Sequence, residues 1–158
     1  MKLIPLTQDK FAQVDDEDFD YLMQFKWCAN KLGNTYYAVN RSIKDKSILM
    51  HRVILGLTDS NILCDHKDHN GLNNQRINLR PCTHSENRAN RKAYGSSKYL
   101  GVYFYTKKNK WVAQITKDSK MKHIGIYSTE IEAALAYNNA AKDLHGEFAN
   151  LNDVPCGN

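Results

Sequence analysis

Hydrophobic and polar residues follow different spacings in the first 60 residues, and these spacings predict one helix and one hairpin. Three large apolar side chains recur near helical spacing behind a run of acids, which predicts a short helix over about 16–24. β-Branched and aromatic residues lie on both sides of the turn-prone segment 43–46 and indicate a β-hairpin. The apolar segment that follows, 53–57, fits either a continuing strand or the start of a helix.

The next stretch is mostly polar and predicts two strands and a helix. Residues 61–66 and 77–82 contain short apolar runs suited to strands, and the segment between them is rich in Asn, Asp and Gly. Thr83 and Glu86 have the spacing of a capping box, which predicts that a helix begins there and continues over about 84–91.

This predicted helix lacks the apolar stripe that usually anchors a helix to a core, because Ala89 and Ala93 are its only apolar residues. Its polar side chains share one face at helical spacing: His84, Asn87, Arg88 and Arg91. A face of this kind points toward water, a metal ion or phosphate.

The last third of the chain predicts a small domain of three strands and one helix. Short strand patterns at 99–106, 110–117 and 122–128 are separated by polar turns. A second capping box, Thr129 and Glu132, starts a helix whose apolar residues recur on one face, namely Ala133, Ala136, Tyr137, Ala140, Ala141 and Leu144. We expect the helix to end at Gly146.

Alternation within these strands separates two faces of the predicted sheet. The face opposite the helix receives Tyr103, Tyr105, Gln114 and Thr116. Trp111 is expected to pack in the core. Asn138 and Asn139 interrupt the apolar pattern of the helix, so we expect both to face solvent.

Positive charge is concentrated in one block of the chain, and this concentration indicates the kind of partner. The net charge is +5 and the isoelectric point is about 9.0, which favours an anionic partner but does not separate nucleic acid from membrane. Residues 83–127 hold ten Lys or Arg against two acids, whereas both ends of the chain are acidic. Such concentration points to a polyphosphate.

Targeting signals and disulfide patterns are not apparent. The chain has no apolar run of transmembrane length, and its first ten residues are too short and polar for a signal peptide. The four cysteines form no C-x-x-C pair. We therefore expect a reduced protein in the cytoplasm, with free thiols.

The polar segment carries groups that suit phosphodiester cleavage. Asp65 offers a hard oxygen for Mg²⁺ or Mn²⁺, and Asn87 on the following helix offers a carboxamide oxygen. His66 can accept a proton from water near neutral pH.

The spacing of these residues resembles the ββα-metal motif of HNH nucleases. Asp65-His66, then Asn78, then Asn87 is similar to the motif of phage-type HNH homing endonucleases that have Asn at the last position. The resemblance implies that His66 is the general base, that Asp65 and Asn87 bind one divalent ion, and that Asn78 orients His66.

Four further residues near this motif have open roles. His51 matches a family position, and neither its role nor that of the neighbouring Arg52 is assigned. His69 departs from the family, where such loops more often carry Gly or a small polar residue; it is either a further phosphate contact or a tolerated loop residue. His84 belongs to the polar helix face.

Residues 98–151 resemble the AP2/ERF DNA-binding domain. Gly101, Lys110 with Trp111, the run 125–141 and the final segment 149–152 carry the match. The resemblance implies that a three-stranded sheet enters the major groove of double-stranded DNA. Plant-type members place arginines where this chain has Leu100 and the residues Tyr103, Tyr105 and Thr116, so Arg-to-guanine readout is mostly absent.

The two resemblances together give a set of expected DNA contacts. These are Arg88, Arg91, Lys92, Lys98, Tyr103, Tyr105, Lys107, Lys108, Lys110, Gln114, Thr116 and Lys122. Lysines suit phosphate contacts and loose sequence preference.

We therefore predict an α+β protein: an N-terminal region with an HNH module over 1–92, a basic linker over 93–97, an AP2-like domain over 98–152 and a tail over 153–158. The predicted function is that of a metal-dependent DNA endonuclease, a monomer without membrane association, in a bacterial or phage-infected cell. One alternative is an AP2-like regulator with a structural zinc site, whose candidate ligands are Cys64, His66, Cys82 and His84. The other alternative is a nuclease that acts on RNA.

Overall fold

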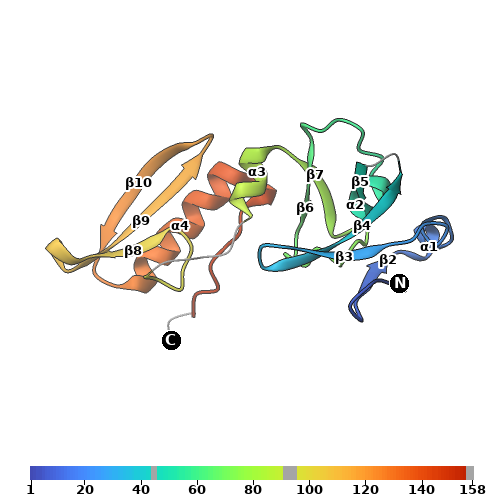
Figure 1. Ribbon diagram of the computed structural model, residues 1–158. Helices are drawn as coiled ribbons and strands as arrows, with labels where there is room; N and C mark the ends of the chain where they lie inside the picture. The colour runs from blue at the N-terminus through green and yellow to red at the C-terminus, as the bar shows by residue number, and fades with distance from the viewer. Residues whose placement is uncertain (44–45, 91–95, 156–158) are drawn as a thin grey trace. The chain divides into compact units, whose positions relative to one another are not determined.

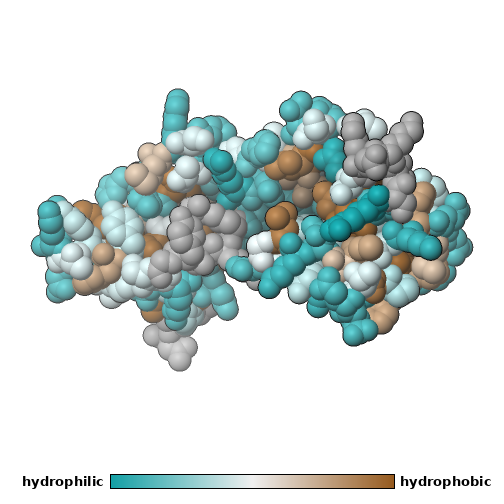
Figure 2. Space-filling model, in the orientation of Figure 1, coloured by the Kyte–Doolittle hydropathy of each residue, from teal (hydrophilic) through white to brown (hydrophobic). Residues whose placement is uncertain are grey.

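The computed structural model describes residues 1–43, 46–90 and 96–155 (Figure 1). The chain divides into two compact units, Met1–His84 and Ser85–Asn158, and each is described by itself. It is an α+β protein built from small antiparallel sheets. On the visible surface of each unit, hydrophilic residues predominate and hydrophobic residues are scattered among them (Figure 2).

The first unit begins with a hairpin that the sequence analysis did not predict. Strands β1 (Lys2–Pro5) and β2 (Phe11–Val14) pair in antiparallel register. Alternation turns one side of the hairpin, which includes Ile4, Ala12 and Val14, into the core. Helix α1 (Asp16–Leu22) follows, close to the predicted 16–24.

A three-stranded sheet follows in the order β3-β4-β5. The predicted hairpin is confirmed as β4 (Thr35–Ile43) and β5 (Lys46–Leu49), while β3 (Cys28–Leu32) was not expected. The chain after β5 forms helix α2 (Met50–Ile54). The apolar segment 53–57 therefore neither continues the strand nor starts a helix, because the helix begins before it and ends within it.

The polar segment forms the predicted pair of strands and begins the predicted helix. Strands β6 (Leu63–His66) and β7 (Leu79–Cys82) are antiparallel, with Asp65 opposite Arg80. Helix α3 (His84–Ala89) begins with the last residue of the first unit and continues into the second. The core of the first unit gathers residues from β1, β2, α1, β4, α2 and β7, such as Leu22, Met50 and Leu79, together with Trp27, which precedes β3.

The second unit is a three-stranded sheet, in the order β10-β9-β8, with one long helix across one face (Figure 1). Strand β8 (Val102–Tyr105) leads through η1 (Thr106–Lys108) to β9 (Lys110–Lys117) and β10 (Lys120–Tyr127). Helix α4 (Glu130–His145) is followed by η2 (Gly146–Phe148).

The ends of α4 agree with the prediction. Thr129 Oγ1 accepts a hydrogen bond from the Glu132 N–H at 3.2 Å, and Glu132 accepts one from the Thr129 N–H at 3.1 Å. This reciprocal capping box satisfies two N–H groups that a helix start otherwise leaves unpaired. Gly146 follows the last helical residue, as expected.

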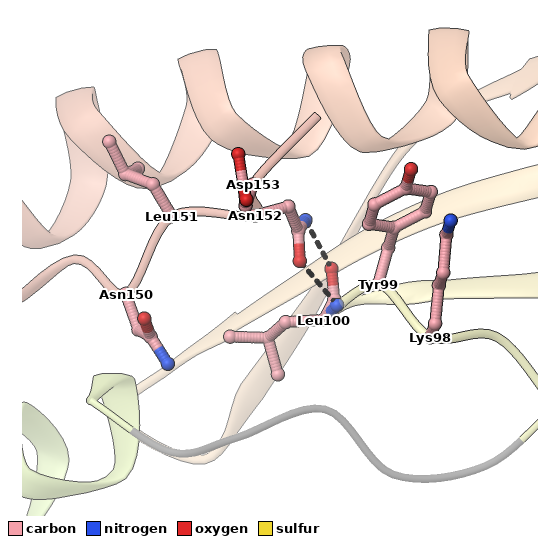
Figure 3. Close-up of a pocket in the computed structure, with 7 residues that line it drawn as sticks. All are labelled: Lys98, Tyr99, Leu100, Asn150, Leu151, Asn152 and Asp153. Carbon is pink, nitrogen blue, oxygen red and sulfur yellow. Dashed lines mark hydrogen bonds between the residues drawn. The ribbon is translucent and has the colours of Figure 1, made fainter. Parts of the chain in front are cut away.

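Asparagine side chains tie the C-terminal segment to the residues just before β8 and to α4. Asn152 reaches the backbone of Leu100, accepting from its N–H at 2.6 Å and donating to its carbonyl at 3.1 Å (Figure 3). Asn138 on α4 binds the backbone of Asn152 in the same two-way manner, at 2.7 and 2.9 Å. We call Asn138, Asn152 and Leu100 the asparagine latch.

The latch corrects one prediction. Asn138 does not face solvent freely, because both ends of its amide are used on Asn152. Asn139 is exposed, as expected. Two members of the latch, Leu100 and Asn152, line the pocket of Figure 3, whose other lining residues lie within 98–99 and 150–153.

Candidate functional site

The loop between β6 and β7 is shaped by its own Asp and Asn side chains. Asp68 accepts a hydrogen bond from the Asn70 N–H at 2.8 Å, and Asn70 accepts one from the Leu72 N–H at 3.1 Å. Such side-chain turns replace backbone pairing where the chain has no strand partner. The high asparagine content of this segment therefore builds a defined loop.

Asn78 closes this loop just behind His66. Its amide donates to Asp68 at 3.0 Å and to the Asn73 carbonyl at 2.8 Å, and it accepts from the Asp68 N–H at 3.1 Å. The backbone carbonyl of Asn78 accepts from the Lys67 N–H at 3.0 Å. Asn78 thus holds the two residues that follow His66. Its predicted action on the imidazole stays a prediction.

The loop is docked on the first hairpin and on β4. The Asn74 N–H donates to the Gln13 carbonyl at 2.7 Å, and the Gln13 N–H donates to the Leu72 carbonyl at 2.8 Å. A Cβ on Gly71 would lie 2.7 Å from the ring of Tyr37, so only glycine permits this close packing. The Tyr37 ring therefore lies directly against the loop.

The acids at the start of α1 bind the same loop. The Arg76 guanidinium contacts Asp18 at 2.6 and 2.9 Å and Glu17 at 2.9 Å, and the Arg76 N–H donates to Asp15 at 2.7 Å. These contacts give a role to part of the acidic N-terminal region. Its carboxylates neutralise Arg76, which belongs to the same unit.

His66 lies among three side chains at the end of β6. Its Nε2 is 3.5 Å from Asn74 Oδ1, and its ring contacts those of His51 and Tyr37 edge-on, with centroids 5.0 and 5.7 Å apart. Burial is the main cause that lowers the pKa of His66 below its usual value. The imidazole is therefore neutral at pH 7, the form that can accept a proton.

Asn74 and Tyr37 are site residues that sequence reasoning missed. Asn74 is completely buried, and Tyr37 comes from a strand about 30 residues earlier in the chain. In the sequence, Asn74 is one of five asparagines between residues 64 and 87, so no spacing distinguishes it. The close packing of Gly71 on Tyr37 is equally invisible without the fold.

His51 and Arg52 differ in their surroundings although they are neighbours on α2. His51 is buried, and this burial, with the nearby charges of His66 and Arg52, lowers its pKa to about 3. The Arg52 guanidinium donates to backbone carbonyls of Leu57, Asp59 and Ile62 at 2.6–3.2 Å. Arg52 thus braces the chain between α2 and β6, whereas His51 belongs to the His66 cluster.

The backbone at His69 has a conformation that suits the glycine common at this position in the family. This residue has φ of 62°, in the left-handed region that favours glycine. Its N–H donates to the His66 carbonyl at 2.9 Å and forms the turn after β6. A phosphate contact by His69 stays a prediction.

Asp65 is buried and paired with Arg80 across the hairpin. Its Oδ2 accepts from Nε and Nη2 of Arg80 at 2.8 and 2.7 Å. A carboxylate and a carboxamide form a donor set that Mg²⁺ and Mn²⁺ accept, so Asp65 and Asn87 suit such an ion chemically. A cation at Asp65 would share this carboxylate with the Arg80 guanidinium.

Asn87 lies on α3 and is exposed. Within the second unit, α3 binds the turn between β9 and β10: Ser85 Oγ accepts from the Asp118 N–H at 3.1 Å, and Arg88 Nη1 donates to Ser119 Oγ at 3.4 Å. The joint binding of one ion by Asn87 and Asp65 stays a prediction. His84 is exposed, and Arg91 and Lys92 lie outside the described residues.

The alternative zinc site finds no support in the hairpin. Cys64 is paired with Pro81 and Cys82 with Leu63, so the two thiols project from opposite faces. Burial raises the pKa of Cys64 to about 12 in the metal-free protein. Within 1–43, 46–90 and 96–155, no three or more His, Cys, Asp or Glu side chains are grouped to hold a metal ion.

The sheet of the second unit places several predicted residues as expected. The register pairs Tyr103 with Val112 and His123 with Gln114, which directs these side chains away from α4. Trp111 packs on the other side, with its ring 5.1 Å from that of Phe104. The predicted basic contacts in the described part of this unit are all exposed: Arg88, Lys98, Lys107, Lys108, Lys110 and Lys122.

Comparison with known proteins identifies the family. No family model matches the chain. Over 149 residues the chain is 34% identical to a protein of Acanthamoeba polyphaga mimivirus described as an uncharacterized HNH endonuclease. The match covers 91% of this chain and 75% of that relative. The chain belongs to the HNH endonuclease family.

Membership of this family associates the site with the hydrolysis of phosphodiester bonds. HNH endonucleases are hydrolases of phosphodiester bonds, and the Asp65-His66 pair occupies the end of a strand in a two-stranded hairpin. Among the helices within the described residues, none is both long and apolar enough to span a lipid bilayer.

Proposed function

We propose that the protein is a metal-dependent DNA endonuclease in which His66 is the general base. The observation that carries this proposal is the imidazole at the end of β6: it is buried, kept neutral by its surroundings and fixed by Asn74, His51 and Tyr37, in a chain of the HNH family.

We propose that Asn74 sets which nitrogen of His66 is the basic one, with Nε2 donating to Asn74 Oδ1. Its amide also donates to the Leu72 carbonyl at 3.2 Å, which leaves Oδ1 directed at His66. An oxygen acceptor requires Nε2 to carry the proton, so Nδ1 becomes the nitrogen that takes a proton from water. The resulting hydroxide attacks the phosphorus, and the 3′-oxygen leaves.

Asp65 and Asn87 are the proposed ligands of one Mg²⁺ or Mn²⁺ ion. When bound, such an ion stabilises negative charge on the phosphate and on the leaving oxygen. Arg80 fixes the Asp65 carboxylate by two hydrogen bonds to one oxygen, so the carboxylate is oriented before an ion arrives.

The second unit is the proposed DNA-holding part. Its three-stranded sheet, with α4 behind it, agrees with the resemblance to AP2/ERF domains, and its exposed lysines suit the DNA backbone. We propose that the sheet face opposite α4 lies in the major groove while the first unit cleaves.

The test is cleavage by a His66→Ala variant. Loss of a general base lowers the rate by about 100- to 10,000-fold, so this variant should nick supercoiled plasmid far more slowly with Mg²⁺. Its DNA binding, measured without metal, should be unchanged because His66 is buried in the first unit.

A matched histidine provides the control. His145→Ala removes an imidazole from the last turn of α4 and should leave the nicking rate within about twofold of wild type. If His66→Ala nicks at the wild-type rate, His66 is not the base. If neither DNA strand is cut by the wild type with Mg²⁺ or Mn²⁺, the endonuclease proposal fails.

A further inference from the structure

The outer face of the β8–β10 sheet has an unusual composition for a DNA-reading surface. All of its positions lie within the described residues: Tyr103, Tyr105, Lys110, Val112, Gln114, Thr116, Met121, His123 and Ile126. None of these is arginine, and the one lysine lies at the start of β9. Arg and Lys are the side chains that most often read guanine, so this face is poorly suited to G·C pairs.

The same face exposes apolar groups near the turn between β9 and β10. Met121 is 67% exposed and is the cross-strand partner of Thr116, which is exposed too. Cross-strand partners lie side by side, so a thioether and a methyl group form one small apolar contact. Ile126 adds a second apolar group and is 43% exposed.

Thymine is the base that such groups recognise. Its 5-methyl group is the apolar feature that base pairs present in the major groove, and it is contacted by apolar side chains and by the threonine methyl. Gln114 lies one outward row from the Thr116–Met121 pair. Glutamine can bind adenine at N6 and N7 with both ends of its amide.

Charge around the face favours DNA over a protein partner or a second copy. Between residues 102 and 127 the chain has six lysines and a single acid, Asp118. Lys110 is exposed on this face, and Lys107 and Lys108 are exposed in the turn before it. Lys120 and Lys122 are exposed on the edge strand β10, where alternation with Met121 places them on the side of α4. An apolar centre with a cationic border complements a groove whose floor carries methyl groups and whose walls carry phosphates.

We propose that this face reads A·T pairs: Met121 and Thr116 contact thymine methyl groups, and Gln114 binds adenine. The proposal deepens the proposed function, since it rests on the binding of duplex DNA by the second unit. It requires nothing of the His66 chemistry.

The test uses the full chain without divalent metal, so that DNA is bound but not cut. Affinity is measured for fluorescent duplexes of equal length with alternating A·T or alternating G·C centres at one salt concentration. We expect at least about tenfold tighter binding of the A·T duplex. Replacement of thymine by uracil, which removes only the methyl groups, should remove most of this preference.

Variants assign the preference to named side chains. Met121→Ala should reduce the difference between thymine and uracil duplexes, and Gln114→Ala should remove the response to 7-deazaadenine, which lacks N7. Both should lose more affinity for the A·T duplex than for the G·C duplex. Leu135→Ala is the control, because Leu135 is 49% exposed on α4, away from this face. Met121 is largely exposed, so its loss should leave the thermal unfolding of the protein unchanged.

Three results would overturn the proposal: equal affinity for A·T and G·C duplexes, a preference for G·C, or equal affinity for thymine and uracil duplexes. Each of these leaves the nuclease assignment standing if the wild type still nicks plasmid in a His66-dependent way. If the wild-type protein binds no duplex at all, both this inference and the proposed DNA-holding role of the sheet fail. His66-dependent nicking would still test the active site separately.

Discussion

At the scale of single residues, the burial of His51 beside His66 and Tyr37 makes the stability of the folded state depend on pH. His51 is buried with a pKa of about 3, whereas an exposed histidine titrates near 6.5. Because the folded state holds the neutral form, protonation favours unfolding. The stability associated with His51 is therefore complete above about pH 6.5 and is lost as the pH falls toward 3.

This linkage gives a prediction for His51→Phe, which keeps an aromatic ring but does not titrate. Between pH 7 and pH 5 the wild type should lose about 2 kcal/mol more unfolding free energy than the variant. Urea unfolding at the two pH values measures this difference. An equal loss in both proteins would mean that His51 stays accessible to protons in the folded state.

At the scale of elements, the asparagine latch holds the C-terminal segment to the residues just before β8 and to α4. Asn138→Ala removes both hydrogen bonds to the Asn152 backbone and leaves those groups in a partly buried position. We expect a loss of about 1–3 kcal/mol in unfolding free energy, measured by denaturant unfolding.

The neighbouring residue is a close control for the latch. Asn139 has the same chemistry and lies on the same helix but is exposed, so Asn139→Ala should change stability by less than about 0.5 kcal/mol. Alanine is also the better helix former at either position. A smaller effect at Asn138 than at Asn139 would contradict the latch.

Elements with regular spacing were predictable, and those held by distant contacts were not. Helix α4 and strands β8–β10 follow from periodicity and capping residues that lie within the elements themselves. Strands β1 and β2 have four residues each, and the turn between them uses left-handed Gln8 and Asp9 without any glycine. Helical periodicity also could not show that Asn138 has a partner fourteen residues later in the chain.

The candidate site was predictable only where a motif spacing marks it. Asp65 and His66 stand out in sequence because they adjoin each other at the end of a strand pattern. Tyr37 and Asn74 reach His66 through the docking of the loop on β2 and β4, which no local pattern records. The ion pair of Asp65 with Arg80 likewise depends on the strand register.

At the scale of the whole molecule, the acidic N-terminal region and the basic block differ in what their charges contact. Acids of α1 are engaged with Arg76, and Asp16 binds the N-terminal ammonium at 2.8 Å. Contacts within the first unit thus neutralise part of the N-terminal acidity. The exposed lysines of the second unit remain to interact with a polyanion.

This distribution predicts a steep dependence of DNA binding on salt. If five or more phosphates are neutralised, a plot of log affinity against log salt should have a slope of about −4 or steeper. Joint replacement of Lys107 and Lys108 by alanine should make the slope less negative by about 2. Lys142→Ala, at the end of α4, is the control and should leave it unchanged. A slope near zero in the wild type would exclude a phosphate-binding role for the basic block.

The contacts of α3 bear on how such proteins can be rebuilt by recombination. The helix that carries Asn87 is fastened through Ser85 and Arg88 to the turn between β9 and β10. A gene fusion that exchanged the C-terminal sheet for a different one would preserve the asparagine in the sequence but remove the fastening of its helix. Functional chimaeras should therefore inherit α3 together with the incoming sheet, and viable crossover points should lie before residue 84.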